Sequence, residues 1–161
     1  MEKGSASANL GGTAVALTKT TADTVTLSGA NTYTGVTTVS AGVLRLDSAN
    51  ALPGGIGTAG GTSALTFNGG VVGLGAGNFT RDLKTAGAVT GANFTGAGGW
   101  AAYGANRIVN LNNDGHQVVW GTADTGLNGQ MLILGASTAT HAVDFQECPR
   151  PGRGKPHGAG G

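Results

Sequence analysis

Charged residues, cysteine and aromatic rings are all scarce in this sequence. Charged residues fill 11% of its 161 positions, whereas ordinary soluble domains devote about a quarter of their residues to charge. The formal net charge of +1 gives no electrostatic reason to expect a nucleic acid or an anionic membrane surface as partner. Disordered tails usually combine high charge with few β-branched residues. The scarcity of charge therefore argues against an ordinary disordered chain.

Long apolar runs and helical periodicity are also missing. No apolar stretch approaches the roughly 18 residues that a helix needs to cross a bilayer, so we expect no membrane span in this fragment. Residues 1–8 include Glu2 and Lys3 and are too polar for a signal peptide. No apolar pattern with a period of 3.6 residues is sustained anywhere, which argues against long helices.

Glycine, threonine and valine dominate instead. Glycine occurs 32 times, and Thr and Val alternate between the glycines, a pattern typical of short strands with a turn after each. Aromatic residues make up only 5% of the sequence, and this scarcity predicts a core of stacked Val, Leu, Ile and Ala. The expected strands are Ala14–Leu17, Thr24–Leu27, Thr37–Val39, Val43–Leu46, Ala64–Phe67, Val71–Leu74, Ala88–Thr90, Arg107–Leu111, Gln117–Trp120, Met131–Leu134 and Ala142–Phe145.

Glycine-rich corners recur between these strands. The triplets that end at Asn31, Asn93 and Asn106 all read Gly-Ala-Asn and look like echoes of one corner element, while residues 47–55, which contain Pro53, predict a loop bulging from a corner. Strands this short gain stability when they stack as rungs. The predicted fold is therefore all-β: a right-handed parallel β-helix or similar β-solenoid, incomplete at both ends, with roughly six coils of about 20 to 25 residues.

The segment 27–46 carries the most specific signature. It begins with Leu-Ser-Gly-Ala-Asn-Thr-Tyr-Thr-Gly and ends with two short strands joined by Ala41 and Gly42. This segment closely resembles the autotransporter-associated β-strand repeat, also called the passenger-associated transport repeat. Upstream, residues 17–29 look like the usual lead-in of that family, and segments near 98–107, 118–121 and 132–146 resemble, more weakly, sequences that accompany the repeat. The resemblance implies a β-solenoid passenger fragment over residues 1–146.

The composition changes after Gln146. Residues 147–161 hold the only cysteine, Cys148, three of the four prolines and three of the nine Lys/Arg residues. One interpretation is a flexible basic linker. The one that we favour is a shifted reading frame, because the same nucleotides read one base later can encode a segment resembling residues 104–111. On either interpretation, we expect a disordered tail, and we draw no redox compartment from Cys148.

No residue pattern points to catalysis, and we expect no enzymatic activity, no catalytic residue, no cofactor and no metal site. His116, His141 and His157 are far apart in the sequence, whereas metal ligands are usually closely spaced. Residues 55–60 match Gly-x-Gly-x-x-Gly, but no buried strand precedes them and no helix follows. Carboxylates that meet across rungs stay open as an alternative, because a solenoid can assemble them from distant positions.

Two surface patterns deserve a second interpretation. Trp100, Tyr103 and Trp120 could form a carbohydrate-stacking face, although aromatic residues more often fill a core. Pairs of the form Thr-x-Thr, at 18 and 20, 24 and 26, and 32 and 34, occur on ice-binding solenoid faces, but the series does not continue beyond Thr38.

The resemblance implies a structural role. We expect a repeat segment of a bacterial passenger that is secreted or displayed at the outer membrane and serves adhesion, with surface glycans or matrix as partners. The alternative is a carbohydrate-binding or polysaccharide-degrading β-helix. Because a solenoid fragment exposes strand edges at its ends, we also expect self-association through those ends.

Overall fold

The computed structural model describes residues 3–57, 61–84, 87–111, 118–121 and 126–146, and these ranges contain thirteen β-strands and no helix. The predicted tail, 147–161, lies outside them. The strands are β1 (Gly4–Ala6), β2 (Leu17–Lys19), β3 (Thr24–Leu27), β4 (Thr37–Val39), β5 (Val43–Leu46), β6 (Leu65–Phe67), β7 (Val71–Leu74), β8 (Phe79–Arg81), β9 (Ala92–Phe94), β10 (Gly98–Ala102), β11 (Arg107–Leu111), β12 (Leu132–Leu134) and β13 (Val143–Gln146).

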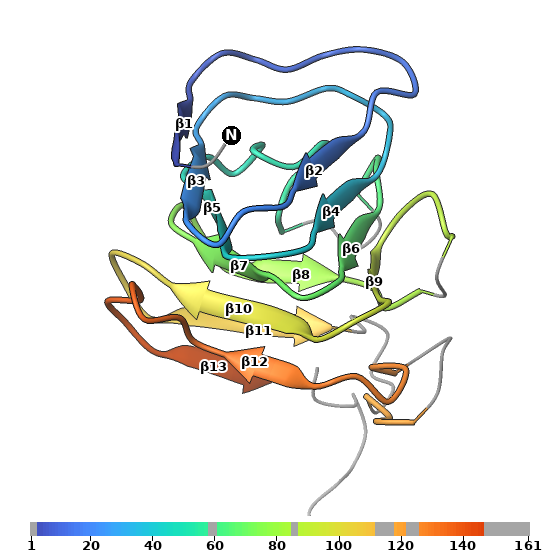
Figure 1. Ribbon diagram of the computed structural model, residues 1–161, viewed down its shortest axis with the longest axis vertical. Helices are drawn as coiled ribbons and strands as arrows, with labels where there is room; N and C mark the ends of the chain where they lie inside the picture. The colour runs from blue at the N-terminus through green and yellow to red at the C-terminus, as the bar shows by residue number, and fades with distance from the viewer. Residues whose placement is uncertain (1–2, 58–60, 85–86, 112–117, 122–125, 147–161) are drawn as a thin grey trace, which may run out of the picture.

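The strands form three parallel sheets that wind around one core (Figure 1). Sheet A has the order β1-β3-β5-β7-β10-β12, sheet B the order β2-β4-β6-β9, and sheet C the order β13-β11-β8. Strands that follow one another in the chain, such as β4 and β5, lie in different sheets and pair with the strands one coil away. The fold is a parallel β-solenoid, which confirms the predicted fold class.

The register of sheet A defines the coils. Gly4, Val25, Leu44, Val72, Trp100 and Leu134 are successive partners in one column. The distances along the chain between these partners are 21, 19, 28, 28 and 34 residues. The six strands of sheet A agree with the predicted number of coils, but only the first two intervals are close to the predicted repeat length, because later coils carry longer loops.

Several predicted strands are displaced. The segment 14–17 was wrong because Ala14 has φ 58° in a turn and the strand starts at Leu17. The segment 88–90 was wrong because it is a bend with Val89 76% exposed, and the strand lies at Ala92–Phe94. Of the strand predicted at 117–120, Gln117 lies outside the described residues, and Val119 forms a single parallel bridge.

Three strands were not predicted: Gly4–Ala6, Phe79–Arg81 and Gly98–Ala102. In the last of these, the glycines belong to the strand rather than to a corner. A Cβ on Gly98 would lie 2.5 Å from Phe67 Cβ, and one on Gly99 would lie 1.8 Å from the Ile133 carbonyl oxygen. Glycine is required here because neighbouring coils pack against its backbone.

The corner at Ala41 and Gly42 was predicted correctly. Gly42 has φ +61°, and a Cβ at this position would lie 2.3 Å from the carbonyl oxygen of Ala22 in the preceding coil. Only glycine combines this backbone conformation with such close packing of successive corners.

Only the second half of the loop predicted to bulge at 47–55 packs inward, because Asp47, Ala49 and Asn50 are exposed. Leu52 and Ile56 are buried, and the Ile56 carbonyl accepts a 2.8 Å hydrogen bond from the Thr80 backbone N–H of β8. The loop therefore takes the place that a preceding rung would have beside sheet C.

The core changes character along the solenoid axis. Aliphatic side chains such as Val25, Leu27 and Leu44 fill the first coils, as predicted. Further on, an aromatic cluster forms around Trp100, whose ring centroid lies 4.8 Å from that of Phe67 and 5.2 Å from that of Phe79. Such contacts contribute about 0.5–1.5 kcal/mol each beyond simple burial. Apart from Tyr33, the buried aromatic residues are thus concentrated in the later coils.

Candidate functional site

The three aromatic residues predicted to stack on sugars do not share a face. Trp100 is 0% exposed in the main core, and Tyr103 is buried in a second, smaller cluster on the outer face of sheet A. Trp120 is 57% exposed. The rings of Trp100 and Tyr103 present no open face, so in this conformation they are not available for stacking. Of the three, Trp120 alone offers an accessible ring.

Tyr103 instead covers the outer face of sheet A. The Tyr103 ring packs directly over Gly73, where an added Cβ would lie 2.8 Å from Tyr103 Cε2. It packs with Val43 and Val71 in a small second core. Its hydroxyl forms a 2.6 Å hydrogen bond with Thr138 Oγ1, so Tyr103 holds a distant return segment against the sheet.

Ionisable side chains do not converge among the described residues, where no group of three His, Cys, Asp or Glu side chains could hold a metal ion. His141 is exposed and pairs with the Thr140 hydroxyl through Nδ1 at 2.8 Å, while His116 and His157 lie outside the described residues. Asp47 pairs with Arg45 at 2.7 Å, and Asp82 with Lys84 at 3.7 Å. These carboxylates are engaged in separate surface pairs.

Sequence reasoning missed a set of inward-facing cations that bind backbone carbonyls at the corners. Lys19 is buried, and its Nζ donates to the Thr21 carbonyl, to Thr21 Oγ1 at 3.0 Å and to the Ala41 carbonyl at 3.2 Å. Burial lowers the pKa of Lys19, an effect partly opposed by Asp23. This ammonium links the corners of two successive coils.

Arg81 does the same for the inward-packed loop. Its guanidinium is fully buried and donates to the carbonyls of Pro53 at 2.9 Å, Gly55 at 2.7 Å and Ser63 at 2.6 Å. Burial lowers the pKa of Arg81 to about 10, with an opposing contribution from Tyr33. A cation that faces carbonyls supplies donors that no strand provides there.

Arg107 holds a third corner, where sheet A leads into sheet C. It donates to the carbonyls of Leu74 at 3.3 Å, Gly75, and Tyr103 at 3.3 Å. The sequence signal for all three cations was their position inside or beside apolar strands in a chain with little charge.

The signature asparagine, Asn31, forms hydrogen bonds to the coils before and after its own. Its Oδ1 accepts from the Leu10 backbone N–H at 2.8 Å, and its Nδ2 donates to the Ala51 carbonyl at 2.7 Å. Asn106 plays a related role by accepting from the Ala142 N–H at 3.1 Å. Asn93 does not: it lies within β9, so the prediction that it echoes the same corner was wrong. Asn9 and Asn78, which were not predicted, accept backbone N–H groups in the same way.

The signature tyrosine, Tyr33, is buried beside this corner. Its hydroxyl lies 2.6 Å from Thr37 Oγ1. Burial raises the pKa of the Tyr33 phenol, while Thr37 and the Arg81 charge act in the opposite direction.

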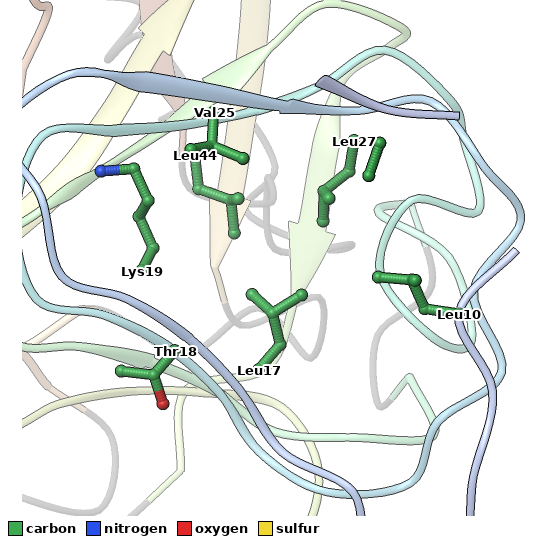
Figure 2. Close-up of a pocket in the computed structure, with 8 residues that line it drawn as sticks. Leu10, Leu17, Thr18, Lys19, Val25, Leu27 and Leu44 are labelled. Atoms are coloured by element: carbon green, nitrogen blue, oxygen red, sulfur yellow. The ribbon is translucent and has the colours of Figure 1, made fainter. Parts of the chain in front are cut away.

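An apolar cavity of about 250 Å³ opens at the β1 and β2 end of the core (Figure 2). Leu10, Leu17, Val25, Leu27 and Leu44 surround it, and the Lys19 amine points away from its centre. The lining is that of a core cross-section, with inward side chains but no polar group aimed into the space. The cavity is therefore suited to apolar packing rather than to chemistry.

These observations define a β-solenoid built on stacked coils and corner hydrogen bonds. Residues 17–46, which span β2 to β5 and contain Asn31, Tyr33 and the Gly42 corner, match the family model of the passenger-associated transport repeat. The chain thus carries an autotransporter passenger repeat, and the match extends the segment recognised at 27–46 back to Leu17. No curated protein and no solved structure matches the chain. Nowhere in the described ranges is there a helix with the length and apolar character needed to cross a membrane.

Proposed function

We propose that this chain is a non-catalytic structural segment of a bacterial autotransporter-like passenger, secreted or displayed at the outer membrane. In this role, it holds more distal regions away from the cell surface. The match of residues 17–46 to the passenger repeat carries the proposal. The arrangement of the coils supports it, because stacked rungs can be extended without changing the contacts within each coil.

The described structure suits a spacer. Most of its polar contacts, including those of Asn31, Arg81 and Arg107, join one coil to another. A rod tied together in this way resists local opening along its length. Adhesion, the finer role, would then depend on the outer faces of the sheets.

Self-association through the solenoid ends is part of the proposal. The apolar cavity lies at one end, and Met131 and Leu134, at 67% and 52% exposure, lie beside and within the edge strand β12 at the other. Apolar surface next to strand edges favours pairing between chains.

Export tests the spacer role. The chain would be placed in the passenger position of a reporter autotransporter, with an epitope tag on its distal side. We expect the tag to be accessible to antibody on intact cells and the solenoid to resist protease. A tag that stays inside the cell, while the reporter without this chain is exported, would overturn the proposal.

A further inference from the structure

The outer face of sheet B carries an ordered column of polar side chains. Thr18, Thr38, Thr66 and Asn93 are successive partners in the parallel register of β2, β4, β6 and β9. The residues that follow them face the opposite way: Lys19, Val39, Phe67 and Phe94 are all buried. The column therefore points outward, because side chains alternate along a strand.

A second column runs beside the first. The ladder continues for one residue past each strand, with the N–H of Ser40 donating to Lys19, that of Asn68 to Val39, and that of Thr95 to Phe67, at 2.8, 3.0 and 2.9 Å. This places Thr20, Ser40, Asn68 and Thr95 on successive rungs. Each of the first three rungs thus presents a pair of hydroxyl or amide side chains, and the series that stops after Thr38 along the sequence continues in space. On the fourth rung, Asn93 is buried and the Thr95 hydroxyl donates to the Phe67 carbonyl at 3.2 Å. In Figure 1, these rungs are stacked at β2, β4, β6 and β9.

The first three rungs are open to solvent. Thr18, Thr20 and Asn68 are exposed, while Thr38, Ser40 and Thr66 are half-buried. No hydrogen bond joins the hydroxyls of Thr18, Thr38 or Thr66 to another described residue. Successive rungs lie about 4.8 Å apart, and the two columns about 6.6 Å apart. The face is a small lattice of neutral groups that can both donate and accept hydrogen bonds.

Asn93 closes the first column and is covered. It is 1% exposed, yet neither its Oδ1 nor its Nδ2 has a hydrogen-bond partner. Buried amides normally find partners, because an unpaired one costs free energy. Because Asn93 is covered, it marks where the open part of the column ends, and the accessible face consists of the three rungs before it.

We propose that the outer face of sheet B binds a neutral, hydroxyl-rich polysaccharide strand that lies along the solenoid axis. The columns contain no charged side chain, so they match a neutral ligand rather than an anionic one. Their regular repeat favours a polymer, since many weak contacts along one strand add up. The inference does not need the passenger assignment: export could fail while binding holds, and the reverse.

Binding to insoluble polysaccharides tests this proposal. The full chain would be incubated with cellulose, chitin and insoluble β-1,3-glucan, and the bound fraction measured against a triple variant, Thr18→Val, Thr38→Val and Thr66→Val. A matched control carries Thr24→Val, Thr26→Val and Thr80→Val, which are half-buried strand positions outside this face. Valine keeps the shape and the strand preference of threonine, so both variants should fold.

We expect the wild-type chain to bind at least one of the three polysaccharides and the array variant to lose about tenfold or more in affinity, because three hydrogen-bonding hydroxyls are removed. The control should stay within about twofold of the wild type. Absence of binding by the wild type, or equal losses in both variants, would overturn the proposal. Inhibition of ice recrystallisation without polysaccharide binding would overturn it as well, and would assign the face to ordered water.

Discussion

The guanidinium carbon of Arg45 lies 4.8 Å from the centroid of the Tyr103 ring, and Arg45 Nε is 2.7 Å from Asp47 Oδ1. Tyr103 in turn bonds to Thr138. Residues from three separate parts of the chain therefore meet on the outer face of sheet A. Side-chain contacts between coils therefore stabilise the outer face of sheet A, in addition to the packing of the core.

Truncation of Tyr103 tests this outer layer. Tyr103→Ala should lower the free energy of unfolding by about 3 kcal/mol, because it exposes the small second core that contains Val43 and Val71. Tyr103→Phe keeps the ring and should cost only about 1 kcal/mol, the value of one hydrogen bond. Urea denaturation measures both, and equal losses would show that the ring contributes nothing beyond its hydroxyl.

The buried cation Arg81 should be far more important than its charge suggests. Arg81→Met leaves the carbonyls of Pro53, Gly55 and Ser63 without their donor, and should cost about 3 kcal/mol or more. Limited proteolysis should then cut within residues 48–57. Arg45→Met, which removes a partly exposed ion pair with Asp47 and the contact with the Tyr103 ring, should cost only about 1 kcal/mol. If Arg45→Met costs as much as Arg81→Met, the corner role of Arg81 is refuted.

Ionisation of Tyr33 should make the fold sensitive to alkaline pH. Because burial raises the pKa of this phenol above its ordinary value of 10.0, the folded state holds the proton more tightly than the unfolded chain does. The corresponding stability is complete below about pH 10 and is lost as the pH rises through the folded-state pKa. Chemical denaturation between about pH 8 and 11, a range that brackets the ordinary tyrosine pKa, should show that the free energy of unfolding falls more steeply for the wild type than for Tyr33→Phe. Parallel curves would contradict the burial of Tyr33.

The two tryptophans should report opposite environments. Trp100 lies in the aromatic core and Trp120 is exposed. The variant Trp120→Phe should therefore keep a blue-shifted emission that acrylamide quenches weakly. In Trp100→Phe, the remaining emission should be red-shifted and strongly quenched. The reverse pattern would mean that Trp100 faces solvent and Trp120 is buried, which contradicts the orientation of β10.

Association through the open end should depend on concentration and on the cavity. Sedimentation velocity should show assemblies that grow with protein concentration, and Leu17→Lys, which places a charge in the cavity lining, should reduce them. Val89→Lys, at an exposed bend, serves as the control and should have no effect. Circular dichroism would confirm that both variants are folded. A wild-type chain that stays monomeric at high concentration would refute association through the ends.

The local strand pattern was readable from the sequence, whereas the arrangement between coils was only partly so. Short segments rich in Thr, Val and Leu between turn residues predicted β3, β4, β5, β7 and β11 to the residue, because such short segments depend on local preference. The strand at Gly98–Ala102 escaped detection because its glycines are required by other coils: Gly98 packs against the Phe67 side chain and Gly99 against the Ile133 backbone. Contacts between distant residues leave no local signal.

The candidate site shows the same division. Individual Thr-x-Thr pairs were visible in the sequence, but the array on sheet B combines threonine with serine and asparagine across loops of unequal length. Register alone brings these residues together. Likewise, Trp100 on β10 is buried in the main core, whereas Tyr103, just after β10, is buried on the outer face of sheet A. Composition alone could not decide which aromatic residues are buried.

Nuclear Overhauser contacts between backbone protons around the Gly42 corner test the central claim most directly. In the sequence, β4 and β5 could equally be read as a hairpin, but in the solenoid they belong to different sheets. The solenoid predicts parallel contacts of Val39 with Lys19 and Phe67, and of Leu44 with Val25 and Val72. Antiparallel contacts that join Val39 directly to Leu44, across the two-residue turn at Ala41 and Gly42, would show a hairpin and contradict the solenoid.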